Sequence, residues 1–141
     1  MPQTIMTIDE AMEFLDAIFP AVRGKFELLE LPPMGSKVRL KVGPEHLRPG
    51  GTVSGPAMFE LADCAFYLAC FGMIGREALT VTTNATINFL RKPKNKAIIA
   101  EVRILRLGRT LITGDVMIFS EGDKKPVAHA TMTYAVPPQM G

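Results

Sequence analysis

Two carboxylates interrupt an otherwise apolar stretch in the middle of the sequence. Glu60 and Asp63 are three residues apart, and they are the only charged residues between Pro56 and Ile74. If this stretch is a helix, the two side chains fall on nearly the same stripe. A carboxylate there is costly to bury unless it is hydrogen-bonded or faces a cleft. The pair is therefore either a polar seam touching solvent or another helix, or a general base or nucleophile suited to hydrolysis of an activated acyl group.

A glycine-containing loop leads directly into the same stretch. Residues 51–55 read GTVSG and are followed by Pro56, which suits the first helical position because its missing N–H would have no partner there. A helix N-terminus presents free N–H groups and a partial positive charge. The backbone N–H of Gly55 or Ala57 could thus stabilise the oxyanion of an acyl transfer. The alternative is that the glycine only helps to start the helix.

Hydrophobic spacing predicts the elements that would position these groups. The capping-box pattern from Thr7 to Glu10 predicts a helix over about residues 7–20, and the apolar stretch predicts a second helix over about 56–75. The second helix is apolar on nearly all faces, so other structure must surround it. Alternating residues predict strands near 26–31, 37–42, 81–89, 98–105, 112–118 and 127–136. The predicted fold is α+β: a curved antiparallel sheet of five to six strands, connected as a meander, wrapped around one long helix.

Length and composition exclude several classes of protein. A chain of 141 residues predicts a single domain spanning 1–141, and a net charge of +2 does not favour nucleic acid as a partner. The longest uninterrupted apolar run, 64–74, falls short of the roughly 18 residues of a membrane span, and the first residues do not resemble a signal peptide. Cys64 and Cys70 would point to different faces of one helix, and two distant histidines do not form a metal site. We therefore expect a cytoplasmic protein that has no membrane partner and binds no metal.

Two segments carry a resemblance to a known family. Residues 46–63, HLRPGGTVSGPAMFELAD, resemble the signature of hot-dog-fold acyl-CoA thioesterases of the phenylacetic-acid-degradation (PaaI) type. Residues 82–93, TTNATINFLRKP, resemble the next strand of that family, and the likeness extends over about residues 40–136. The resemblance implies a hot-dog fold that hydrolyses acyl-CoA to free acid and CoA without a cofactor. It also implies a homodimer or a dimer of dimers, with each site built between two subunits.

The family's site residues can be carried over position by position. Its catalytic carboxylate corresponds to Asp63, as general base or nucleophile, and the glycine whose N–H holds the thioester oxygen corresponds to Gly55. A residue that reaches across from the neighbouring subunit corresponds to Thr82, or to Thr83 if the register shifts by one. The residues expected to contact the substrate are Ser54, Arg48, Thr82, Thr83 and His46.

The sequence departs from the family pattern next to these residues. Ser54 stands where the family has a histidine, Pro56 replaces its second glycine, and Arg48 replaces its asparagine. The hydrogen bonds around the leaving thiolate and the water must therefore differ. The alternative function is a non-catalytic hot-dog module that binds acyl-CoA or another apolar ligand. Arg48 could hold a substrate carboxylate or a CoA phosphate, or could equally be a surface residue. The basic cluster of Arg91, Lys92, Lys94 and Lys96 could bind the phosphates of CoA, although a solvated turn is the commoner explanation.

Overall fold

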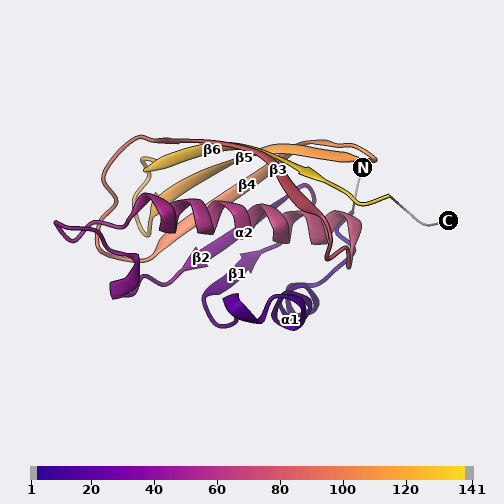
Figure 1. Cartoon of the computed structure of the whole chain (residues 1–141), viewed down its shortest axis with the longest axis horizontal. Helices are drawn as coiled ribbons and strands as arrows, with labels where there is room; N and C mark the ends of the chain where they lie inside the picture. Colours follow the sequence, from indigo (N-terminus) through magenta and orange to yellow (C-terminus); the bar gives the residue numbers. More distant parts are fainter. Residues whose placement is uncertain (1–2, 139–141) are drawn as a thin grey trace.

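A computed structural model describes residues 3–138 and shows one sheet curved around a long helix (Figure 1). The helices are α1 (Ile8–Ile18) and α2 (Gly55–Ile74), with short 3₁₀ turns at Pro20–Val22 and Pro44–His46. The strands are β1 (Phe26–Glu30), β2 (Gly35–Leu40), β3 (Val81–Phe89), β4 (Ile98–Leu107), β5 (Leu111–Ser120) and β6 (Ala128–Ala135). This is the predicted α+β hot-dog architecture, with α2 on the concave face of the sheet.

The order of the strands differs from a simple meander. All pairs are antiparallel and the order is β1-β2-β4-β5-β6-β3, so β1–β2 and β4–β5–β6 are consecutive neighbours and β3 lies out of sequence order. Strand β3 pairs with β6 rather than with β4, because residues 90–97 carry the chain from this edge past β6 and β5 to the interior of the sheet. The predicted meander is wrong at this point, since alternation shows which face a residue takes but not which strand lies beside it. As a result, β3 is an edge strand with one side open in the described chain.

Local capping explains where α2 begins and ends. Ser54 is the N-cap, and its Oγ accepts the N–H of Ala57 at 3.2 Å. Gly55 is therefore the first helical residue, and Pro56 occupies the second position rather than the predicted first. The helix ends before Gly75, whose φ of 83° lies in the left-handed region that glycine favours. These caps fix the orientation of Gly55 relative to the rest of the helix.

The sheet and α1 bury most of α2. By length and composition α2 could cross a membrane, but 67% of its apolar window is buried inside the fold, as expected for the core helix of a soluble protein. Gly114 on β5 permits close packing, because a Cβ there would lie 2.9 Å from the Phe66 ring. Helix α1 has the predicted capping box and packs Phe14 edge-on against Phe71 of α2, with ring centroids 5.0 Å apart. It lies beside β1 and leaves one strip of α2 uncovered (Figure 1).

Candidate active site

Asp63 is held by hydroxyl groups from two neighbouring strands. Thr82 of β3 donates its hydroxyl to Asp63 Oδ1 at 2.7 Å. The Tyr134 hydroxyl of β6 lies 2.6 Å from the same oxygen and 2.7 Å from the Asp63 carbonyl. Thr82 and Tyr134 are register partners across the β3–β6 pair, so the sheet itself places both hydroxyls over α2. The other oxygen, Oδ2, forms no hydrogen bond within residues 3–138 and is available to water or substrate.

Tyr134 is a site residue that the sequence reasoning missed. Its side chain is 3% exposed, and burial, together with the neighbouring Asp63 carboxylate, raises its pKa above the usual range. The phenol therefore stays protonated and acts as a hydrogen-bond donor. The alternation of β6 could have indicated it, because Tyr134 lies on the same inward-facing side of the strand as Ala128, Ala130 and Met132. A buried tyrosine hydroxyl needs a hydrogen-bond partner, and that requirement points to a nearby polar group.

Thr82 contacts Asp63 of its own chain. The resemblance predicts that this residue reaches across from the neighbouring subunit, and that role stays a prediction beside the contact with Asp63 of its own chain. Thr83, the alternative, lies where the β3–β6 register shifts, and its hydroxyl donates to the Thr133 carbonyl at 3.2 Å. Of the two threonines, Thr82 is therefore the one bound to Asp63, and Thr83 is bound to β6.

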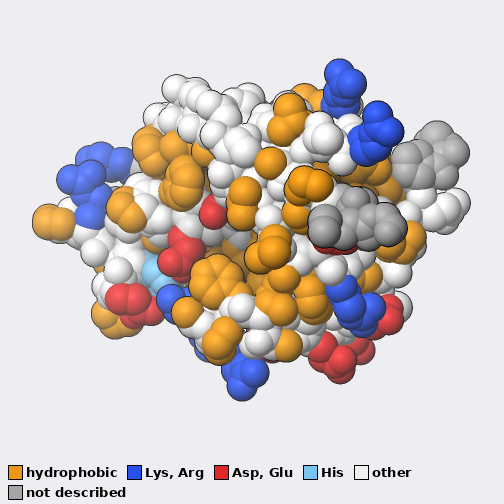
Figure 2. Space-filling model, turned by 45° about the vertical axis from the view of Figure 1, so that its right-hand side comes forward, with side chains coloured by type: hydrophobic (Ala, Val, Ile, Leu, Met, Phe, Trp, Pro, Cys, Tyr) orange, Lys and Arg blue, Asp and Glu red, His pale blue; other side chains and the backbone are white. Residues whose placement is uncertain are grey.

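Asp63 opens into two adjoining cavities. The outer Asp63 pocket, of about 510 Å³, lies between α2 and the start of β3 and includes Leu79, Val81 and Thr82. The inner Asp63 pocket, of about 130 Å³, is lined by Phe19, Val22, Phe26, Glu60, Asp63, Cys64, Tyr67 and Tyr134. The face shown in Figure 2 carries hydrophobic side chains across its centre, with a few acidic ones among them.

Neither cysteine of α2 is suited to act as a nucleophile. Burial, reinforced by the charges of Asp63 and Glu60, raises the pKa of Cys64 to about 12. Burial also raises the pKa of Cys70, whose side chain is fully buried. Because the thiolate is the reactive form, both thiols are inert at neutral pH. The carboxylate that lines both cavities is Asp63.

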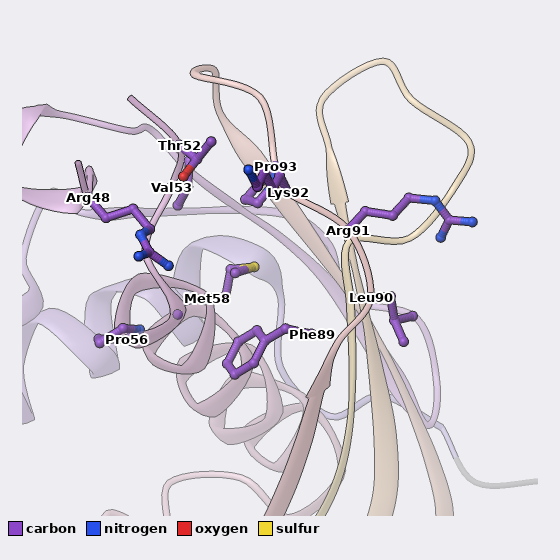
Figure 3. A pocket seen from close by; sticks show the side chains of 11 residues that line it. Arg48, Thr52, Val53, Pro56, Met58, Phe89, Leu90, Arg91, Lys92 and Pro93 are labelled. Atoms are coloured by element: carbon purple, nitrogen blue, oxygen red, sulfur yellow. The ribbon is translucent and has the colours of Figure 1, made fainter. Parts of the chain in front are cut away.

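Gly55 lines a separate cavity at the N-terminal end of α2. The Gly55 pocket has a volume of about 540 Å³ and is lined by Arg48, Thr52, Val53, Gly55, Pro56, Met58, Phe89, Leu90, Arg91, Lys92 and Pro93. Figure 3 shows the Arg48 guanidinium turned toward Pro56 and Met58, with the Phe89 ring facing the same space. The N–H of Gly55 forms no hydrogen bond within the described chain, whereas that of Ala57 is used by the Ser54 cap. Gly55 is therefore free to serve as an oxyanion donor, and the prediction for Ala57 is wrong.

His46 and Ser54 support the loop before α2 and do not line the Gly55 pocket. His46 is buried, and its Nδ1 accepts the N–H of Gly43 at 2.9 Å. The His46 carbonyl in turn accepts the N–H of Ser54 at 2.7 Å, so both residues shape the entry to α2. Arg91 donates to the Pro126 carbonyl at 3.0 Å and points away from the cavity (Figure 3). The predicted basic residues that line this cavity are Arg48, Lys92 and Arg91, and the Arg91 guanidinium is turned away from it.

One chain does not bring Gly55 and Asp63 together. They are eight residues apart on the same helix, which corresponds to about 12 Å along its axis. They also line different cavities. The chain therefore carries two separate groups of residues. We call Gly55 with Arg48 and Lys92 the Gly55 half-site, and Asp63 with Thr82 and Tyr134 the Asp63 half-site.

Comparison with known proteins identifies the family. The model of the Thioesterase superfamily matches residues 50–127, which include Gly55 and Asp63. The chain belongs to the thioesterase superfamily. It is a thioester hydrolase of the PaaI-like type with the hot-dog fold, as the two quoted segments predicted.

Solved structures of other thioesterase-superfamily proteins show how far the likeness extends. A crystal structure from Silicibacter sp. TM1040, described as a candidate thioesterase, is 46% identical, with a TM-score of 0.90 over 96% of this chain and 95% of that one. A single-site mutant of the phenylacetic acid degradation protein PaaI from Thermus thermophilus is 27% identical, with a TM-score of 0.70 over 89% and 99% of the two chains. The protein smu.793 from Streptococcus mutans UA159, solved bound to acetyl CoA, is 26% identical, with a TM-score of 0.72 over 84% and 93%. No sequence among curated proteins matches significantly.

Proposed function

We propose that this thioesterase hydrolyses acyl-CoA, and that each site joins the Asp63 half-site of one subunit to the Gly55 half-site of another. The observation that carries the proposal is the Asp63 carboxylate. One oxygen is fixed by Thr82 and Tyr134, and the other is free at the mouth of two partly apolar cavities. Such a carboxylate is oriented for chemistry on an acyl group lying against it.

The reaction requires only water in addition to the thioester. As a general base, Asp63 takes a proton from a water molecule whose oxygen attacks the carbonyl carbon; the C–S bond then breaks, the CoA thiolate takes up a proton, and CoA and the acid are released. As a nucleophile, Asp63 attacks the carbon itself, the C–S bond breaks to release the CoA thiolate, and the mixed anhydride so formed is hydrolysed by water to the acid and free Asp63. Both routes give the same products. In both, Thr82 and Tyr134 are positioning residues, because they orient the carboxylate without contacting the acyl group.

The Gly55 half-site supplies what the carboxylate cannot. During attack, negative charge builds on the thioester oxygen, and a free N–H at a helix N-terminus stabilises that charge. Arg48 and Lys92 line the same cavity and provide positive charge for the phosphates of CoA. The binding of acetyl CoA by the related S. mutans protein supports a CoA thioester as the substrate.

The need for a second subunit follows from distance. A carbonyl within hydrogen-bonding range of Gly55 cannot also be within reach of an Asp63 lying about 12 Å further along the same helix. A twofold axis that sets two α2 helices antiparallel would bring the Gly55 of each beside the Asp63 of the other. Exposed apolar residues mark this surface, with Phe59 on α2 at 38% exposure and Val81 and Phe89 on the open edge of β3 at 54% and 52%. We infer a homodimer through α2 and β3, alone or within a dimer of dimers.

Thiol release from a panel of short, long and aromatic acyl-CoAs tests the proposal. We expect turnover of part of the panel, and a loss of kcat of about 10² to 10⁴ in Asp63→Asn, in the range of general-base catalysis. Asp9→Asn is the matched control, because Asp9 is exposed in the first turn of α1. Turnover unchanged by Asp63→Asn would remove Asp63 from the mechanism. A monomer by light scattering at micromolar concentration would contradict the shared site.

A further inference from the structure

A second carboxylate lies beside Asp63 and is not satisfied. Glu60 lines the inner Asp63 pocket, and its Oε1 is buried without a hydrogen-bond partner in the described chain. Within residues 3–138, no lysine, arginine or histidine lines this cavity. A buried, unpaired carboxylate oxygen is costly to a fold, so its presence at a cavity wall needs an explanation.

The other polar groups of this pocket cannot satisfy Glu60. The Tyr67 hydroxyl donates to the Ala78 carbonyl at 2.5 Å, and the Tyr134 hydroxyl is engaged by Asp63. The remaining candidate donor on the lining is the Cys64 thiol, which is weak. The pocket therefore offers an acceptor without offering the donor to match it.

We propose that Glu60 is a specificity-determining residue, which accepts a hydrogen bond from a hydroxyl or amino group on the acyl part of the substrate. The inference rests on the proposed function, since it assumes that the acyl group enters the pocket beside Asp63. A neutral hydroxyl and a charged ammonium are both donors to a carboxylate, and the ammonium would also neutralise its charge. An unsubstituted chain would enclose the carboxylate without a partner and would be disfavoured.

The geometry limits where the donor can lie on the substrate. Glu60 and Asp63 are three residues apart on α2, which places their Cβ atoms about 5–6 Å apart. A donor near Glu60 must then be within a few bonds of a carbonyl carbon near Asp63. A cavity of about 130 Å³ also admits only a compact group, comparable with the roughly 150 Å³ cavity that takes benzene. The substrate class that fits is a short acyl-CoA with a hydroxyl or amino group at the β position.

Three thioesters of nearly equal size test this assignment: butyryl-CoA, 3-hydroxybutyryl-CoA and 3-aminobutyryl-CoA. We expect the wild-type protein to prefer at least one donor-bearing substrate over butyryl-CoA by about tenfold or more in kcat/KM, because sites built around a buried polar group reject analogues that leave it unpaired. Glu60→Leu should abolish that preference. Glu60→Gln keeps an acceptor without the charge, so it should retain preference for the hydroxyl and lose preference for the amine. Glu13→Gln, on the exposed face of α1, is the matched control.

Binding measurements separate this inference from the proposed function. Titration of Asp63→Asn protein, with and without Glu60→Leu, gives the affinity for each thioester without turnover. If the wild-type protein hydrolyses the three thioesters with equal kcat/KM and Glu60→Leu changes none of the ratios, the assignment of Glu60 is overturned while the proposed function stands. If Glu60→Leu weakens the dimer and lowers all three activities equally, Glu60 serves the interface and the assignment is also overturned. If no acyl-CoA in the panel is hydrolysed or bound, the proposed function itself fails.

Discussion

The two half-sites of α2 differ in almost every chemical respect. At the N-terminal end, Gly55 offers a free backbone N–H beside Arg48 and Lys92, in an open cavity. In the middle of the helix, Asp63 offers a carboxylate oriented by two hydroxyls, beside apolar and aromatic walls. In the proposed mechanism, the Gly55 half-site stabilises the negative charge that builds on the thioester oxygen, and the Asp63 half-site supplies the carboxylate that acts as base or nucleophile. A single helix can carry both because a second copy of the chain, running antiparallel, would set one against the other.

After Asp63→Asn, the largest expected effect comes from removing the N–H of Gly55. Gly55→Pro deletes this donor at a helical position that tolerates proline, where Ser54 already has the extended backbone that precedes one. We expect kcat to fall by about 10² to 10³, as for loss of an oxyanion donor. Gly55→Ala is the matched control, since it keeps the N–H and adds a Cβ that would lie 3.2 Å from the movable Phe89 ring.

Stopped-flow thiol release and circular dichroism should be measured on both variants. If Gly55→Ala and Gly55→Pro lose the same activity while both remain folded, crowding against Phe89 is responsible and the N–H has no role. The Gly55 half-site would then have no backbone N–H that stabilises the oxyanion.

A smaller effect is expected when the support of Asp63 is weakened. Tyr134→Phe removes one hydroxyl from Oδ1 and leaves the ring packed, so kcat should fall about ten- to a hundredfold with KM nearly unchanged. Thr82→Val, which removes the other hydroxyl from an exposed position, should cost less. A rise in KM with unchanged kcat would show that these residues bind substrate instead of positioning the carboxylate. Steady-state kinetics with thermal melts distinguish these results from simple destabilisation.

Charge at the Gly55 half-site is expected to affect binding more than chemistry. Arg48→Ala should raise KM for acyl-CoA severalfold, and the difference should shrink at high salt because solvent-exposed charges are screened. An acyl-pantetheine substrate, which lacks the nucleotide phosphates, should show no such difference. Arg91→Ala is the control, because that side chain points away and is bound to the Pro126 carbonyl. A KM for acyl-pantetheine that rises equally would place Arg48 against the acyl or pantetheine part.

The smallest effect is expected at Cys64, although it is adjacent to Asp63. A thiol whose pKa is raised to about 12 stays protonated from pH 7 to 9, so alkylation of the native protein should be slow over this range and accelerate only toward pH 12. Cys64→Ser should keep activity within about twofold. Rapid modification by iodoacetamide at pH 7.5 with parallel loss of activity, followed by mass spectrometry, would contradict this.

Local patterns predicted most of the helices and strands. The capping box at Thr7, the apolar stretch of α2 and six alternating segments each depend on neighbouring residues, and the structure has all of them within a few positions. The family signature placed Asp63 and Gly55 on α2, where spacing alone left a structural role open. Gly55 and Asp63 lie in separate cavities because they are eight residues apart on one helix, about 12 Å along its axis.

Contacts between distant parts of the chain could not be predicted in the same way. Strand β3 lies beside β6 because of a crossover that alternation does not encode, and this crossover brings Thr82 to Asp63 within one chain. Tyr134 is 71 residues from Asp63 in sequence, so no local motif joins them. Ser54 is the N-cap, so α2 starts one residue earlier than predicted. The position of this cap decides which N–H at the start of the helix remains free.

Mixing two inactive variants tests the shared site most directly. Asp63→Asn and Gly55→Pro should each be nearly inactive alone, but a mixed dimer would contain one site with an intact Asp63 and an intact Gly55. After subunit exchange or co-expression in equal amounts, random pairing predicts recovery of about one quarter of wild-type activity. Light scattering before and after mixing confirms that dimers are present and that subunits have exchanged. No recovery in fully exchanged mixtures would show that each active site is built within a single chain, contrary to this account.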